Sequence, residues 1–282
     1  MSLMISLRII YRAGWKWSDD GGMRMGAALA YYAIFSTMPF LLIALYFAAA
    51  LYGGDAALGR VHVQLENVLG HAAAKAIEDL IDMAGQQQEA AWTAPTLSVL
   101  FLIVGALSAF ADVRTSLSTI WKLQPPYGNT WLGMLWDYLL ALVLMTVIAL
   151  LILVSLAASL AVPIVWRIFP GVNLQWVELA ASFIFLTAFF TALYRILSAG
   201  RISWGYVIYG SFIAAVLFSL GKTLLSYYLV YTGTESMYGA AGSIVVFMVW
   251  IYYSSQILFF GAELIQARRT RHEWMDEKPL AA

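Results

Sequence analysis

The chain contains no cysteine, which excludes disulfides, haem thiolate ligation, iron–sulfur clusters and zinc thiolate sites. Charge is also scarce, since 11% of the 282 residues are charged, against about 25% in typical soluble domains. The 16 basic residues equal the 16 acidic ones, so no net charge attracts nucleic acid. Because 62% of the residues are hydrophobic, the composition excludes an ordinary soluble domain and predicts a membrane protein.

Histidine is nearly absent as well, with His62, His71 and His272 as its three occurrences. The first two lie nine positions apart, on opposite sides of one helix, and the third is predicted across the membrane. Neither a paired-histidine metal site nor a histidine-dependent triad can be assembled from them within one subunit. No phosphate-binding G-x-x-x-x-G-K-[ST] motif occurs. We expect no catalytic residue, metal or cofactor, and no enzyme activity, although serine or carboxylate catalysis stays open as a third hypothesis.

Six uncharged stretches approach or exceed the length of about 20 residues that crosses a bilayer as a helix. They contain 16 to 29 residues each and comprise 25–52, 94–111, 138–166, 179–194, 202–221 and 236–262. Spans of this length are helices, because backbone groups in lipid must form hydrogen bonds within their own segment. We therefore predict an all-α fold, a polytopic membrane helical bundle of six transmembrane helices in which residues 1–282 form a single domain. The short connection after residue 197 predicts that the fourth and fifth spans are antiparallel neighbours.

The basic residues divide unequally between the two faces that six crossings create. Twelve fall on the face that holds both termini and four on the opposite face. Since lysine and arginine are retained on the cytoplasmic side, both termini are predicted in the cytoplasm.

Three segments are predicted to lie outside the hydrocarbon. Residues 1–24 repeat basic side chains among apolar ones, which is typical of a basic interfacial helix on the cytoplasmic leaflet and not of a secretory signal. Residues 53–92 have apolar residues at helical spacing and predict an external amphipathic segment. Residues 263–282 form a cytoplasmic tail.

Polar and aromatic side chains within two spans mark a candidate substrate pathway. Pro39 lies near the middle of the first span and removes a helical hydrogen bond, so a kink is expected there. Ser36 and Thr37 either satisfy the freed backbone or line a path. Aromatic residues of the last span share one stripe, which could equally be core. The candidate pathway comprises Tyr31, Tyr32, Ser36, Thr37, Pro39, Trp250, Tyr253 and Gln256.

Charged residues beside the spans form two further candidate sites. At the cytoplasmic level, an ion-pair gate or a plain interfacial network is predicted for Arg24, Asp112, Arg114 and Glu263. On the external side, Lys222 either extends to the interface or pairs with Glu235 or a substrate anion.

Three short motifs stand near the first and last spans: Ala-Leu-Ala-Tyr-Tyr at 28–32, Tyr-Gly-Ala-Ala-Gly-Ser at 238–243, and Trp-Ile-Tyr-Tyr-Ser at 250–254 followed by Gly-Ala-Glu at 261–263. In these motifs the sequence resembles the YihY/BrkB family of bacterial inner-membrane proteins, once labelled ribonuclease BN. The Asn-Ile-Trp often seen after the second span stands here as Thr-Ile-Trp at 119–121. The resemblance implies a multi-pass protein of the inner membrane, with members variously labelled ribonuclease, virulence factor or transporter.

Ribonuclease activity fits the residues badly, because loops this short offer neither a solvent-facing acid–base or metal constellation nor a basic groove. The sequence favours passive or secondary transport of an amphipathic or lipid-like molecule. A non-transporting membrane scaffold or assembly factor is the alternative. Membrane lipids are the expected partners, nucleic acid is not, and small-residue faces leave a homo-oligomer open.

Overall fold

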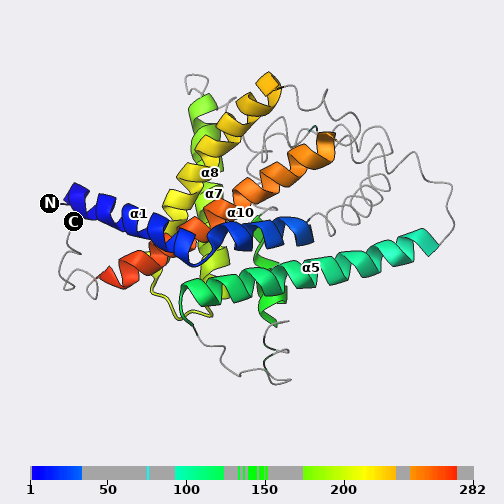
Figure 1. Ribbon diagram of the computed structural model, residues 1–282, viewed down its shortest axis with the longest axis horizontal. Helices are drawn as coiled ribbons and strands as arrows, with labels where there is room; N and C mark the ends of the chain where they lie inside the picture. The colour runs from blue at the N-terminus through cyan, green and yellow to red at the C-terminus, as the bar shows by residue number, and fades with distance from the viewer. Residues whose placement is uncertain are drawn as a thin grey trace, which may run out of the picture. The chain divides into compact units, whose positions relative to one another are not determined.

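The computed structural model describes residues 2–33, 75, 93–123, 133, 136, 139–144, 146–148, 150–151, 174–232 and 242–271. Within these ranges the regular structure is helical and no strand occurs, so the all-α prediction is confirmed for the described chain. Figure 1 labels the helices whose two ends are both described. They are α1 (Ser2–Asp19), α5 (Thr93–Ile120), α7 (Leu174–Leu197), α8 (Trp204–Thr232) and α10 (Gly242–Arg269).

Three of these helices contain stretches long and apolar enough to cross a membrane. The stretches are Leu179–Leu197, Trp204–Leu224 and Phe247–Arg269, with mean hydropathies of 1.7, 1.6 and 1.2. They overlap the predicted fourth, fifth and sixth spans, and α5 covers the predicted second span. Most of the first and third spans and the external segment 53–92 fall outside the described residues.

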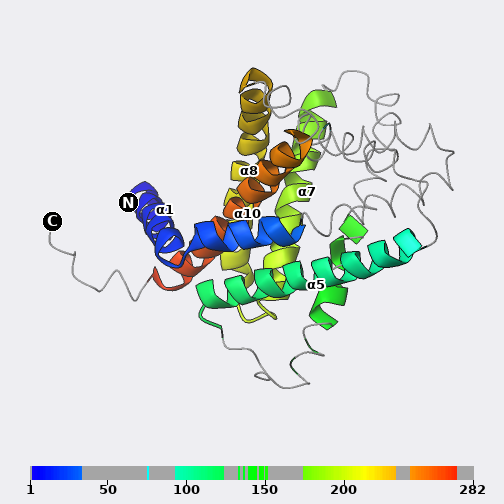
Figure 2. The ribbon, with the colours of Figure 1, turned by 45° about the vertical axis from the view of Figure 1, so that its right-hand side comes forward.

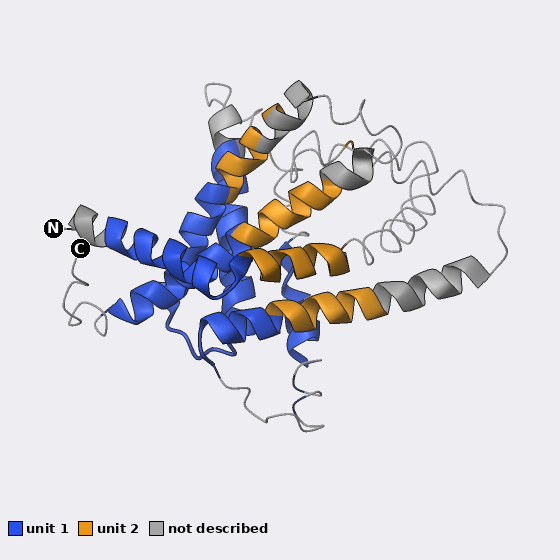
Figure 3. Ribbon diagram, viewed as in Figure 1, with its two compact units in different colours: residues 1–22, 114–217, 257–282 blue, residues 23–113, 218–256 orange. Residues whose placement is uncertain are grey.

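The chain divides into two compact units, which Figure 3 distinguishes by colour. Unit 1 comprises residues 1–22, 114–217 and 257–282, and unit 2 comprises residues 23–113 and 218–256. Each of the contacts described below lies within one of them.

Helix α7 and the first half of α8 form an antiparallel hairpin in unit 1, and they lie side by side in Figures 1 and 2. Phe183 meets Phe212 near one end, and Arg195 meets Trp204 at the other. The turn uses left-handed backbone at Ala199 and Gly200, with φ of 48° and 73°. The predicted antiparallel pairing is confirmed.

The second half of α10 is fixed in unit 1 by close contacts with α8. A Cβ at Gly210 would lie 2.8 Å from the carbonyl oxygen of Gly261, so the two helices approach backbone to backbone. A Cβ at Gly261 would lie 3.1 Å from that of Ala214 and would clash with the hydroxyl of Tyr194. Small residues are therefore used here for contact inside one unit.

Helix α1 also packs onto α10 within unit 1. Ile9 and Ala13 are buried in one cluster with Leu264 and Ala267. Tyr11 lies on another face of α1 and is 76% exposed. One face of the N-terminal helix is thus held by the protein, while large apolar side chains remain on its surface.

Candidate functional site

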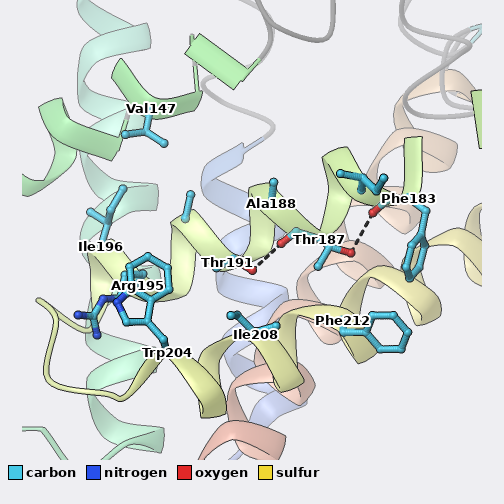
Figure 4. Close-up of a pocket in the computed structure, with 12 residues that line it drawn as sticks. Val147, Phe183, Thr187, Ala188, Thr191, Arg195, Ile196, Trp204, Ile208 and Phe212 are labelled. Carbon is cyan, nitrogen blue, oxygen red and sulfur yellow. Dashed lines mark hydrogen bonds between the residues drawn. The ribbon is translucent and has the colours of Figure 1, made fainter. Parts of the chain in front are cut away.

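An apolar groove lies over α7 and α8 of unit 1, with a volume of about 690 Å³ (Figure 4). This size falls within the range of small-molecule sites, about 300–1,000 Å³. Val147, from the helical residues 146–148, also lines it. Because no residue of the groove belongs to the sequence-predicted pathway, the structure identifies it independently of the sequence analysis.

The floor of the groove is a stripe along α7 that repeats every three or four residues, as one helical face requires. Ala188 and Ala192 supply its small side chains. Thr187 donates its hydroxyl to the carbonyl of Phe183 at 2.9 Å, and Thr191 donates to the carbonyl of Thr187 at 2.7 Å, as the dashed lines of Figure 4 mark. Both hydroxyls are thereby satisfied within the helix, so these threonines add little polarity to the groove.

The wall on α8 carries large apolar side chains spaced by four residues. Trp204, Ile208 and Phe212 are 54%, 49% and 50% exposed. Phe212 closes one end of the groove by meeting Phe183 edge to face, with ring centroids 5.3 Å apart. In a bilayer, exposed surface of this kind contacts hydrocarbon.

A single guanidinium marks the opposite end of the groove. Arg195 donates from Nη1 to the carbonyl of Gly200 at 3.0 Å and also to that of Ile202. Its Cζ lies 4.7 Å from the ring centroid of Trp204, a cation–π distance. The groove is therefore amphipathic, apolar over most of its length and cationic at one end.

Two further arginines of unit 1, Arg114 and Arg201, lie outside the predicted spans 94–111, 179–194 and 202–221. Burial lowers the pKa of the Arg114 guanidinium, and the positive charge of Arg201 lowers it further. Arg201 belongs to the turn whose carbonyls accept from Arg195. Arg201 of this turn is thus near a second cation of the same unit, Arg114.

The part of the predicted pathway on the first span lies in unit 2. Tyr31 is 57% exposed and meets Tyr32 edge to face, with centroids 5.7 Å apart. Ser36, Thr37 and Pro39 fall outside the described residues, so the predicted kink stays a prediction.

The part of the pathway on the last span packs against small residues of unit 2. Gln256 contacts Gly26, and both polar atoms of its terminal amide are buried without a hydrogen-bond partner among the described residues. The ring of Tyr253 lies directly on Gly221, and Trp250 meets Phe218 edge to face at 5.9 Å. The contact between Gln256 and Gly26 joins the last predicted span to the first.

The predicted cytoplasmic charge network is shared between the units. Arg24 and Asp112 belong to unit 2, while Arg114 and Glu263 belong to unit 1. In the part of the chain that the structure describes, one buried carboxylate oxygen of Asp112 has no hydrogen-bond partner, and burial raises the pKa of this carboxyl. The predicted network among the four residues stays a prediction.

Glu263 has charged neighbours within unit 1 that the sequence did not indicate. It is 2% exposed, and the charges that act on it come from Asp20, Lys16 and Lys122. Lys16 donates to Asp19 at 3.0 Å, and this hydrogen bond raises the pKa of Lys16. The burial of Glu263 follows from the packing of α1 on α10, which sequence spacing alone could not reveal.

The external candidate site is described in part. Lys222 is half-buried in unit 2, next to the glycine on which Tyr253 lies, and Glu235 falls outside the described residues. In the described part of the chain, no three histidine, aspartate or glutamate residues are grouped to hold a metal ion.

Comparison with known proteins decides the family. The family model described as virulence factor BrkB matches residues 15–281. The chain belongs to the BrkB family. The resemblance found in the sequence motifs is thereby confirmed.

Relatives of this BrkB family member are named UPF0761 membrane proteins. One from Alcanivorax borkumensis is 27% identical over 254 residues, covering 89% of this chain and 58% of the relative. One from Pseudomonas aeruginosa is 25% identical over 255 residues, covering 89% of this chain and 60% of the relative. The chain thus spans about three fifths of the length of these curated relatives. No solved structure matches it.

Proposed function

We propose that the protein crosses the bacterial inner membrane six times, with both termini in the cytoplasm, and moves an amphipathic or lipid-like molecule passively or by secondary transport. Three apolar helices, relatives named membrane proteins and the twelve-to-four division of basic residues support this arrangement. The proposal includes no catalytic step and no cofactor.

The amphipathic groove of α7 and α8 carries the proposal. Its walls offer apolar contact along two helices of membrane-spanning length, and its single cationic group is Arg195 at one end. A molecule with a polar head and an apolar body matches that distribution, whereas a small hydrophilic solute would find few hydrogen-bond partners along the groove.

The predicted first and last spans supply the rest of the proposed route. A helix break at Pro39 would expose backbone groups to a polar head that moves through the membrane. The amide of Gln256, which is buried and has no hydrogen-bond partner within the described ranges, is a second polar group for such a head. Aromatic residues of the last span would contact the apolar body.

Flux in proteoliposomes tests the proposal. The protein would be reconstituted with a fluorescent phospholipid analogue, and an impermeant quencher would report the fraction that changes leaflet. Ala188→Trp fills the groove and should reduce the rate, while Ser182→Trp adds the same ring at an exposed position of α7 outside the groove and should not. If the phospholipid changes leaflet at the same rate with both variants and with the unmodified protein, the groove is not part of the transport route.

The proposed orientation has its own measurement. Because the chain lacks cysteine, Arg269→Cys creates a single thiol at an exposed position. An impermeant maleimide should label it only after cells are opened. Labelling in intact cells would place the carboxyl end of α10 outside and would contradict the proposed topology.

A membrane scaffold remains the alternative function, and a serine- or carboxylate-dependent membrane enzyme the third. The scaffold is favoured by the large apolar residues left on the surface of unit 1 outside the groove, such as Leu142, which is 63% exposed. Absence of flux in every lipid, together with a stable oligomer in detergent, would favour it.

A further inference from the structure

The guanidinium of Arg195 retains donors after it has closed the turn. An arginine side chain has five N–H groups, and Nη1 supplies the bonds to the carbonyls of Gly200 and Ile202. A Cβ placed on Gly200 would lie 3.7 Å from Nη2. The φ of 73° favours glycine there, and the position that its Cβ would occupy beside Nη2 is empty. A planar donor edge of this kind suits an oxyanion such as phosphate.

The charge at this end of the groove favours an anion. In the described residues, the contacts of Arg195 are two neutral carbonyls and the neutral ring of Trp204. Arg201 lies between those two carbonyl residues in the sequence and carries a second positive charge. Arg201 also lowers the pKa of the Arg114 guanidinium, because like charges oppose each other.

The length of the groove matches one leaflet of a bilayer. Phe183 and Arg195 are twelve positions apart on α7, which at 1.5 Å per residue is about 18 Å. Half the hydrocarbon core of a membrane measures about 15 Å. An occupant with its head at Arg195 would therefore place its tail along the groove as far as the middle of the membrane.

We infer that the groove of α7 and α8 binds one anionic phospholipid of the cytoplasmic leaflet, with its phosphate on Arg195 and an acyl chain along Ala188 and Ile208. The head lies in the cytoplasmic leaflet because the turn of residues 198–203 belongs to the face that carries twelve of the sixteen basic residues. This inference rests on the proposed membrane topology and names the class of lipid for the same groove.

Native mass spectrometry of the purified full chain tests the inference. The protein in detergent would be titrated with phosphatidylglycerol and, separately, with phosphatidylcholine of the same acyl chains. We expect the protein to retain one phosphatidylglycerol molecule more tightly than it retains phosphatidylcholine. Arg195→Gln should weaken that retention about five-fold, since one basic side chain near a lipid surface contributes about 1 kcal/mol. Arg269→Gln, which removes an exposed arginine of α10, should leave it unchanged.

A second pair of variants keeps Arg195 in place in case the turn needs it for folding. Ala188→Trp should abolish retention of both lipids by filling the groove, while Ser182→Trp should retain them. Equal binding of the two lipids, or unchanged retention in both Arg195→Gln and Ala188→Trp, would overturn the inference.

The inference and the proposed function can fail separately. Selective retention of phosphatidylglycerol without flux in any lipid would support a bound lipid and remove the transport function. Flux that persists in Ala188→Trp and Arg195→Gln, with no selective retention, would overturn the lipid site and leave transport by another route.

Discussion

Tyr194 donates its phenolic hydroxyl to the main-chain carbonyl of Leu258 at 2.7 Å, which fastens α7 to α10. One turn further along α10, the indole of Trp121 donates to the carbonyl of Ala262 at 3.1 Å. Both donors are fully buried, and they meet edge to face with ring centroids 6.0 Å apart. Two bonds to one helix backbone fix the helix that carries Glu263 and hold α7, the floor of the groove, in place.

Removing the first of these bonds should destabilise the protein measurably. Tyr194→Phe leaves the ring and deletes one buried hydrogen bond, so we expect a loss of about 1 kcal/mol. Thermal unfolding in detergent would measure it. Tyr11→Phe, at a largely exposed ring, is the matched control. An equal melting temperature for both variants would show that the bond to Leu258 contributes nothing.

The close contact between Tyr194 and Gly261 predicts that α10 requires glycine at position 261. Gly261→Ala would drive a methyl group into the tyrosine hydroxyl and toward Ala214, and overpacking of this kind costs about 1–3 kcal/mol. Gly14→Ala, on α1, meets no atom within 4 Å, and should be neutral or stabilise by about 0.5–1 kcal/mol. Unfolding curves of the two variants should therefore shift in opposite directions; a matching shift would refute the close approach.

Asp112 predicts a dependence of stability on pH. Burial raises the pKa of this carboxyl above its ordinary value, which is near 4. The folded protein therefore binds the proton more tightly than the unfolded chain. The contribution of Asp112 to the free energy of unfolding is complete when the pH lies below the pKa of this carboxyl in the unfolded chain. It is lost as the pH rises through the pKa of the folded protein.

Asp112→Asn should remove the loss of stability that ionisation of the buried carboxyl causes. The variant should therefore be more stable than the unmodified chain at neutral pH. Melting temperatures measured from pH 4 to pH 8 would check it. As a contrasting variant, Asp19→Asn removes an exposed carboxylate that accepts from Lys16 and should give no gain in stability at neutral pH. If the melting temperatures of Asp112→Asn and the unmodified chain change in parallel with pH, the buried carboxyl is excluded as the source of the pH dependence.

The predicted interfacial position of α1 can be measured with single thiols, since the chain has no cysteine. A polarity-sensitive fluorophore at Tyr11→Cys should shift to the blue when the protein enters liposomes rich in anionic lipid, and high salt should reduce the effect of lipid charge. Ala13→Cys, buried against α10, should react slowly in either setting. A label at position 11 that reports bulk water in liposomes would refute the interfacial position.

Parts of the fold followed from local sequence. The uncharged stretches predicted the apolar lengths found in α7, α8 and α10. The few residues between Leu197 and Trp204 predicted the antiparallel hairpin, because so short a connection returns the chain beside itself. The family followed from motifs near the first and last spans. Of the candidate pathway, the sequence indicated Gln256 and Tyr253 as polar groups of a span, but not the glycines on which they lie.

The amino-acid sequence by itself determined a helical membrane protein, because uncharged runs of this length must satisfy their backbone hydrogen bonds internally. Tertiary structure decided the groove and the burial of Glu263. The groove requires Ala188 on α7 and Ile208 on α8 to line one hollow, and Glu263 is enclosed because α1 packs on α10. Both depend on which faces of distant segments meet, and the composition and periodicity of a single segment carry no information about its partner's register.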